Sequence, residues 1–278
     1  MTITTRDGLI NAMGNLNTQV VIDKLSIANA AAGQFHSLWR AGGQPAAGAI
    51  PGAAAVCDNA LIGCLPFADQ TSPVTSYLGW AQITVAVLGM FEIHDRLMHT
   101  GGLSGTVTTA QTANVDLHAN LATANLAARI GKSDYSEVNW WLEWYTDTGA
   151  TASNATVNVT YNDGTSGDLA VVAVGGTVRA SRMIPLNNLI PAAKAGLFIR
   201  DVNTVTLSAS TTVAGSFGVT ATRLRAGLPQ QFVNFAQIFD WTELGLPDVP
   251  NDSCLMLNVL ASNTTTGVVR GYARLLHG

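Results

Sequence analysis

Charged residues are scarce in this chain of 278 residues. Lysine, arginine, aspartate and glutamate together make up 12% of the sequence, which is about half the share of roughly 25% in typical soluble domains. Only three lysines occur, and no lysine and arginine cluster is present. A surface that follows nucleic-acid phosphates needs a basic stripe, and the net charge here is -4. We therefore expect no direct contact with nucleic acid.

Long apolar runs are also missing. The longest apolar stretch, residues 80–93, is interrupted by Gln82, Gly89 and Glu92, whereas a membrane-spanning helix needs about 20 apolar residues. The first six residues lack a basic start followed by an apolar core, so we expect neither an export signal nor a membrane location. The low charge then indicates a surface of neutral polar residues, together with area that is buried between subunits.

Cysteine is rare and odd in number. The three cysteines are Cys57, Cys64 and Cys254, and their spacing does not fit the Cys-x-x-Cys pairs of structural zinc sites. Without an export signal, an odd count favours reduced, buried thiols in a protein that is made in a cytoplasm.

The segment with the most aromatic residues reads as β-structure. Residues 137–145 alternate in polarity and place Trp140 and Trp144 on one apolar face, which is the period of a strand. Residues 156–161 alternate again, and an Asn-Asp-Gly turn separates them from a third run at 168–174. Asp-Gly favours tight hairpins, so the pattern predicts an antiparallel meander that holds three of the six tryptophans.

The rest of the chain continues this pattern. One helix is predicted, at residues 114–130, where leucine and alanine recur at helical spacing. Further strands are predicted at residues 81–88, 90–98, 202–209 and 216–224, and a closing hairpin joins 254–261 to 267–276. Many short strands at close spacing predict a mainly β protein, an antiparallel β-sandwich of jelly-roll type with one short helix.

The first 70 residues differ in composition from the rest. Residues 41–55 are rich in glycine, proline and alanine, with Pro45 and Pro51 keeping the backbone extended or turning. Such a tract does not form a packed core alone. We therefore divide the chain into an extended N-terminal arm at residues 1–70 and a β-sandwich body at residues 71–278.

The most site-like cluster lies at residues 94–99, where His94, Asp95 and His99 stand close together in the sequence. Two histidines that share one metal on a helix need a spacing of four residues. Here the spacing is five, which on a strand sends the two rings to opposite faces. The cluster therefore predicts polar residues at a strand end, and we expect no metal or other cofactor.

Three other motifs are interpreted as ordinary structural features. The segment Asp163 to Asp168 carries oxygen ligands but lacks the alternate acidic positions of a calcium loop, so it is interpreted as a hairpin turn. Ser104 has glycine neighbours at the wrong positions for a nucleophile elbow. Glu137 and Glu143 flank tryptophans, but on one strand they would be roughly 20 Å apart, too far for a glycosidase pair. No catalytic residue is predicted.

Three blocks of sequence resemble a family of structural proteins of tailed bacteriophages. They are residues 36–49 (HSLWRAGGQPAAGA), 94–105 (HDRLMHTGGLSG) and 141–150 (WLEWYTDTGA). The resemblance seen in these blocks extends over most of the chain. It implies a virion protein, and in bulk the chain suits a head decoration (cement) protein, which in such phages is commonly a trimer with a β-sandwich body on the capsid lattice.

The resemblance and the composition together define the expected function. We expect a non-enzymatic virion protein on the capsid exterior that assembles in the host cytoplasm, binds the major capsid protein and forms a homotrimer. The alternatives are a tail, neck or receptor-binding protein that recognises host glycans through exposed tryptophans, and a glycan hydrolase. The predicted interface residues, most of them in the arm, are Phe35, Trp39, Pro45, Pro51 and Trp141.

Overall fold

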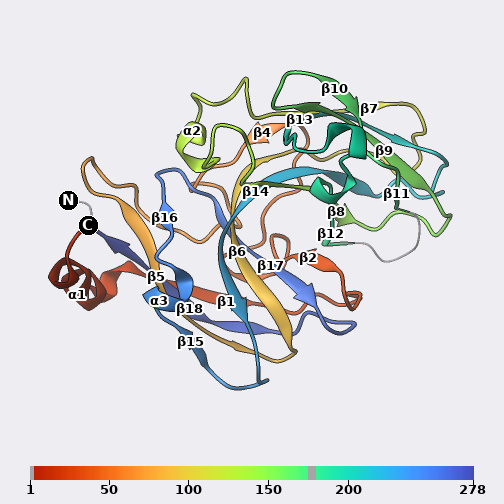
Figure 1. Cartoon of the computed structure of the whole chain (residues 1–278). Coiled ribbons are helices and arrows are strands. Elements are labelled where there is room, and N and C mark those ends of the chain that lie inside the picture. The colour runs from red at the N-terminus through yellow and green to blue at the C-terminus, as the bar shows by residue number, and fades with distance from the viewer. Residues whose placement is uncertain (1–2, 175–179) are drawn as a thin grey trace. The chain divides into compact units, whose positions relative to one another are not determined.

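The structure is mainly β, and its strands pair antiparallel (Figure 1). It is a computed structural model that describes residues 3–174 and 180–278. The chain forms two compact units, each assembled from separate segments. The first unit contains residues 3–49, Asp58–Asp95 and Leu224–Gly278, and the second contains Ile50–Cys57 and Arg96–Arg223.

The first unit is organised around one sheet with the strand order β15-β5-β18-β1-β3, in which β16 also pairs with β5 (Figure 1). Strands β2 and β17 and the first part of β6 form a second set, ordered β2-β17-β6. Its elements are α1 (Arg6–Gly14), η1 (Leu16–Thr18), β1 (Gln19–Lys24), β2 (Phe35–Ser37), β3 (Gly43–Gln44), β5 (Ser76–Val85), β6 (Gly89–His99), β15 (Gln237–Phe239), α3 (Trp241–Leu244), β16 (Asp248–Val249), β17 (Leu255–Ala261) and β18 (Val269–His277).

Alternating side chains explain this sheet. In β5 the side chains of Ala81, Ile83 and Val85 are buried, while those between them are partly exposed on the other face. The buried set packs with Phe91, Ile93, Leu257 and other apolar side chains in one hydrophobic cluster. One face of the sheet is therefore core, and the other is an outer face.

The second unit has its own core. Its sheet has the order β10-β9-β13-β7, with β11 pairing with β9, while β8 pairs with β12 and β14 and the end of β6 pairs with β4. Its elements are β4 (Ala55–Val56), β7 (Gln111–Asp116), α2 (Leu126–Arg129), β8 (Val138–Thr146), β9 (Asn154–Tyr161), β10 (Ser166–Asp168), β11 (Val172–Ala173), β12 (Arg182–Pro185), η2 (Asn187–Leu189), η3 (Ala192–Lys194), β13 (Ile199–Leu207) and the first part of β14 (Ser216–Pro229). Trp140, Trp144, Val157 and Val202 lie in one buried cluster.

The predicted mainly β class is confirmed, but several predicted strand partners are wrong. The strands at 137–145 and 156–161 exist as β8 and β9, yet β9 pairs with β10, β11 and β13, and β8 pairs with β12 and β14. Likewise, β17 and β18 do not form the predicted closing hairpin, because β17 pairs with β2 and β6 whereas β18 pairs with β1 and β5. Of these strands, β9 and β10 do pair across the turn that joins them, whereas β8 and β9 lie in different sheets, as do β17 and β18.

The predicted helix at 114–130 is also wrong. Its first residues extend β7, which pairs with β13, and helix is limited to α2 at Leu126–Arg129. Asn114, Ala124 and Asn125 have left-handed backbone angles of φ 46° to 50°, which interrupt a right-handed helix. Burial of Val115, Leu117 and Leu126 in the core outweighs local helix propensity.

The arm predicted at residues 1–70 is not a separate extension. Within its described residues, β1 pairs along its length with β18, and Ile22 and Leu38 are 1% exposed. The ammonium of Lys24 donates to the carbonyls of Ala41 (3.0 Å) and Pro45 (2.7 Å) and so holds the glycine, proline and alanine tract in place. Most side chains of the tract are small, and among them Ala41 packs into the core of the first unit. Residues 1 and 2 of the predicted arm lie outside the described residues.

Candidate functional site

The cluster at residues 94–99 lies on β6, and its charged side chains are used in separate internal contacts. His94 Nε2 lies 2.8 Å from Glu92 Oε2, and His99 Nδ1 accepts a hydrogen bond of 2.9 Å from Arg96 Nε. Both histidines are buried. In the part of the chain that the structure describes, no group of three potential metal ligands occurs.

In the second unit, Arg96 is the centre of a buried polar network. Its guanidinium lies 2.7 Å from Glu143 Oε2 and donates to the Tyr145 hydroxyl at 2.9 Å. Thr220 Oγ1 donates to the same carboxylate oxygen. Burial by itself would lower the pKa of Arg96, but Glu143 outweighs burial and raises that pKa. Burial and then the Glu143 charge raise the pKa of the Tyr145 phenol.

In the first unit, Arg225 and Asp95 form the corresponding buried pair. Arg225 Nη2 lies 3.1 Å from Asp95 Oδ2, and Asp95 Oδ1 accepts from the backbone N–H of Cys254 at 2.9 Å. Arg225 Nη1 also donates to the carbonyl of Asp248 at 3.0 Å. These side chains are 0% to 1% exposed. In both networks a buried guanidinium is matched by a buried carboxylate, so neither charge is left unpaired in the core.

The two carboxylates that flank the tryptophans are both bound internally. Glu143 is 1% exposed and held by Arg96, while Glu137 pairs with Arg223 and lies 4.0 Å from Lys132. Glu143 therefore cannot reach a glycosidic bond from its position in the core. The site that a glycan hydrolase needs is not formed by this pair.

The remaining motifs occupy the places predicted for them. The Asp163 segment forms the β9–β10 turn, in which Thr165 N–H donates to Asp163 Oδ1 at 2.8 Å and Gly164 takes φ 84°. Ser104 lies in a loop, where its hydroxyl contacts Thr106 Oγ1 at 2.9 Å. The three cysteines are buried thiols without a disulfide. Tyr161, which begins the turn, is also buried in the core of the second unit.

The predicted interface residues are mostly core residues. Trp39, Pro45, Pro51 and Trp141 are buried, and Phe35 is half-buried in β2. The chain itself therefore covers most of these side chains, and the expectation that they form an interface with another protein stays a prediction.

Local packing shows how this covering works. The Trp39 indole Nε1–H donates to the carbonyl of Ala49 at 3.1 Å, and Gly48 lies against the ring so closely that a Cβ there would be 2.0 Å from Cε2. The Trp141 indole donates to Thr222 Oγ1 at 2.9 Å. A glycine-rich tract thus wraps a tryptophan, because only glycine permits this approach.

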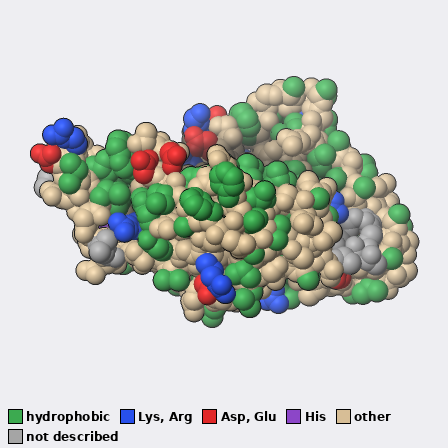
Figure 2. Space-filling model, turned by 90° about the horizontal axis from the view of Figure 1, so that it is seen from below, with side chains coloured by type: hydrophobic (Ala, Val, Ile, Leu, Met, Phe, Trp, Pro, Cys, Tyr) green, Lys and Arg blue, Asp and Glu red, His purple; other side chains and the backbone are tan. Residues whose placement is uncertain are grey.

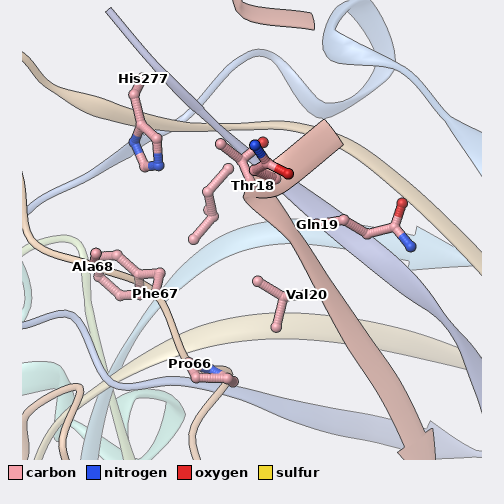
Figure 3. Close-up of a pocket in the computed structure, with 9 residues that line it drawn as sticks. Thr18, Gln19, Val20, Pro66, Phe67, Ala68 and His277 are labelled. Atoms are coloured by element: carbon pink, nitrogen blue, oxygen red, sulfur yellow. The ribbon is translucent and has the colours of Figure 1, made fainter. Parts of the chain in front are cut away.

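A small cavity of about 130 Å³ opens at one end of the main sheet of the first unit. Figure 3 shows His277 and Phe67 on one side of it, with Thr18 and Val20 opposite and Pro66 below, while the Gln19 amide points away. His277 Nδ1 lies 2.9 Å from Ser76 Oγ, and burial lowers the pKa of the imidazole. Its lining carries no charged side chain at neutral pH, so it offers a binding space for no more than a small neutral group.

The outer face of the first unit's main sheet presents apolar and aromatic side chains in register. Ile238 of β15, Gln82 of β5, Tyr272 of β18 and Val21 of β1 lie opposite one another in a single row across four strands. In the next row, Arg274 lies 4.7 Å from the ring centre of Trp80. Figure 2 shows hydrophobic side chains over much of the face seen from below, with charged side chains in small separate groups.

An exposed apolar surface continues at the margin of this sheet. We call it the edge patch, and it consists of the side chains of Phe232, Val233, Phe235, Ile238 and Trp241, which are 43% to 62% exposed. No charged residue occurs from Ala226 to Phe239. These aromatic residues form a recognisable segment of the sequence between Pro229 and Pro247, but they are not among the predicted interface residues. The sequence feature that marks this segment is the absence of charged residues from Ala226 to Phe239.

Comparisons of the sequence and the structure with family models, with curated proteins and with solved structures find no match. The functional conclusion consequently depends on the residues and their geometry. Among the residues described, no helix is long and apolar enough to cross a bilayer.

Proposed function

We propose that this chain is a structural virion protein that binds and stabilises a phage capsid shell as a decoration (cement) protein. The observation that carries the proposal is the combination of a charge-poor surface with the exposed apolar row and the edge patch of the first unit. Exposed apolar patches on a folded protein mark surfaces that a partner covers. The resemblance of residues 36–49, 94–105 and 141–150 to phage structural proteins supports a shell subunit as that partner.

The buried networks support the same proposal. Because Arg96, Glu143, Asp95 and Arg225 are used to hold strands together, the polar groups with perturbed environments have a structural role. A decoration protein needs a stable body and an outer surface that binds the shell. In this proposal the buried ion pairs stabilise the body, and the exposed apolar row and the edge patch bind the shell. We extend the proposal to topology: the passage of consecutive strands between sheets fits a sandwich of jelly-roll type.

The protein would contact the shell through folded surface and not through a flexible arm. Residues 19–24 form a strand inside the main sheet of the first unit, so deletion of residues 1–55 removes part of the fold as well as any contact. Point substitutions on the outer face, such as Val21→Arg, therefore test this contact without removing part of the fold.

The experiment that tests the function is quantitative mass spectrometry of purified particles from the source, with this chain counted against the major shell subunit. A ratio comparable with that of the shell subunit supports a decoration protein over the whole lattice. A few copies per particle would place the chain in the tail or neck, and absence from particles would overturn the structural role.

The second candidate is a tail, neck or receptor-binding protein that recognises host glycans. The tryptophans of β8 cannot serve it, since they are buried, but Trp80 and Tyr272 lie partly exposed on the outer face, with ring centres 4.7 Å apart. Aromatic faces beside the amide of Gln82 and the guanidinium of Arg274 are chemistry that binds sugars. Glycan binding that is lost in Trp80→Ala, combined with few copies per particle, would favour this candidate.

A further inference from the structure

Arg274 carries an unmatched positive charge on the outer face of the first unit's main sheet. Its guanidinium carbon lies 4.7 Å from the centre of the Trp80 ring. In the part of the chain that the structure describes, the Arg274 side chain takes part in no ion pair and no hydrogen bond, and its Nε atom is buried without a partner. The fold therefore holds this charge against an aromatic ring and supplies no carboxylate to balance it.

Arg270 lies on the same face of β18, and its charge is matched. Arg270 Nε lies 3.2 Å from Asp23 Oδ1, and Asp23 stands directly opposite it on β1. The residues opposite Arg274 on the two neighbouring strands are Gln19 and Trp80, and neither is acidic. The two arginines thus share a strand and a face, and they differ in whether a carboxylate lies across the strand.

Large side chains surround the unmatched charge. The rings of Trp80 and Tyr272 have their centres 4.7 Å apart. In the row that contains Tyr272, Val21 and Ile238 are 54% and 53% exposed. Tryptophan, tyrosine and arginine are the residues that most often dominate the binding energy of protein interfaces. A carboxylate that reaches Arg274 in these surroundings is partly shielded from water, which strengthens its attraction to the guanidinium.

We propose that the partner of this outer face presents an aspartate or glutamate side chain to Arg274 and surrounds that carboxylate with apolar surface. A guanidinium is a planar group with several N–H donors, and a carboxylate accepts two of them at once. The inference rests on the proposed function and deepens it, because it states the chemistry that the shell subunit brings to this face.

Other occupants match the surroundings of Arg274 less well. A nucleic acid needs several cations along its phosphates, whereas Arg270 is already paired and Lys24 is 1% exposed. A neutral saccharide would leave the charge unmatched. It would also compete for a Trp80 ring that already contacts the Arg274 guanidinium and the Tyr272 ring. A single unmatched arginine among apolar side chains is suited to one carboxylate on a folded protein surface.

Binding of the purified full chain to source particles that were assembled without it tests the inference. Co-sedimentation with increasing amounts of added chain gives a Kd for each variant. Arg274→Gln is expected to raise the Kd at least about tenfold, because it leaves the partner's carboxylate without its cation. Arg274→Lys keeps the charge but loses the planar donor group, so an intermediate Kd is expected.

The matched control is Arg270→Gln, which changes the net charge by the same amount on the same strand face. It lies four residues from Arg274, about 13 Å along the strand. That distance exceeds the screening length of about 8 Å at physiological ionic strength. We expect this control to change the Kd less than about twofold. Urea unfolding of both glutamine variants checks that each remains folded under the binding conditions.

Failure of the inference and failure of the proposed function give different results. If the wild type binds the particles and Arg274→Gln binds no more weakly than Arg270→Gln, the inference is overturned while the function stands. If the wild type does not bind the particles, the function is overturned and the inference with it. Self-association of the wild type that is lost in Arg274→Gln would assign the carboxylate to a second copy and also overturn the inference.

Discussion

Two groups of aromatic residues in this protein have opposite surroundings. Trp140, Trp141 and Trp144 on β8 are 0% to 5% exposed inside the second unit, whereas Phe232, Phe235 and Trp241 in the first unit are 43% to 62% exposed. The first group lies within the nine-residue strand β8 and the second beside the three-residue strand β15, and both are rich in large apolar surface. The difference is that β8 is covered on both of its faces, while β15 stands at the margin of a sheet. Aromatic content alone therefore does not locate an interface.

The largest effect that separates the two groups is expected from truncation of a buried tryptophan. Trp140→Ala removes a ring that is 0% exposed and whose Nε1–H donates to the carbonyl of Ile199 at 2.9 Å. We expect it to lower the free energy of unfolding by about 3–5 kcal/mol. Phe235→Ala, at 62% exposure, is expected to change it by less than about 0.5 kcal/mol. Urea titration followed by circular dichroism measures both, and equal losses would contradict the comparison.

The ion pairs provide a second contrast of nearly the same size. Glu143→Gln leaves the fully buried Arg96 without its carboxylate, and we expect a loss of about 3–5 kcal/mol because an unmatched charge remains in the core. The control is Asp23→Asn, which breaks the exposed pair with Arg270, whose side chains are 46% and 68% exposed. That pair is expected to contribute about 0–1 kcal/mol. The interpretation fails if the two substitutions cost the same in urea unfolding.

A pH measurement probes the buried amine that holds the glycine, proline and alanine tract. Burial lowers the pKa of Lys24 to about 8 from 10.5. Between pH 8 and 10.5 the unfolded chain binds more protons at this residue than the folded chain, so this residue makes the protein more stable as pH rises through that window. We expect a gain of roughly 1–2 kcal/mol, smaller than the full shift because two carbonyls solvate the ammonium.

The contribution of Lys24 is separated from that of other groups by a difference measurement. Unfolding of the wild type and of Lys24→Met is followed across the same pH range, and the difference between the two curves is expected to rise between pH 8 and 10.5. A flat difference would show that Lys24 has an ordinary pKa in the folded protein.

The smallest expected effect concerns the indole of Trp141. Thr222→Val keeps the shape of the side chain but removes the hydroxyl that accepts from Trp141 Nε1 at 2.9 Å. Because Trp141 is buried, we expect a loss of about 1–2 kcal/mol for the unmatched donor. Thr84→Val, on the partly exposed outer face of β5, serves as the control. A loss at Thr222 no greater than at Thr84 would show that the indole bond contributes little.

The parts of the fold that the sequence predicts correctly are those with strong strand periodicity. Residues 156–161 and 216–224 alternate strongly, and both form strands that contain them, β9 and β14. The Asn-Asp-Gly turn at 162–164 is equally local and forms as predicted. The helix at 114–130 failed because its apolar spacing is satisfied by core contacts of Val115, Leu117 and Leu126 in other conformations.

The site was harder to predict than the strands. Tryptophans are large enough to serve either as core or as interface, and the sequence does not say whether a strand is covered on one face or on two. Trp39 is a core residue because Gly48 lets the backbone lie directly against its ring. The edge patch is exposed because β15 lies at the end of the sheet order.

By itself, the sequence determined the mainly β class, the positions of most strands, the reduced cysteines and the neutral character of the surface, because each depends on local periodicity or composition. Only the tertiary structure decided which strands pair, that residues 19–24 belong to a sheet, and that the tryptophans of β8 are buried. The physical reason is that strand pairing and burial depend on contacts between residues far apart in the chain, such as Val21 with Tyr272. The same long-range contacts leave β15 at a margin of its sheet, beside the exposed side chains of the edge patch.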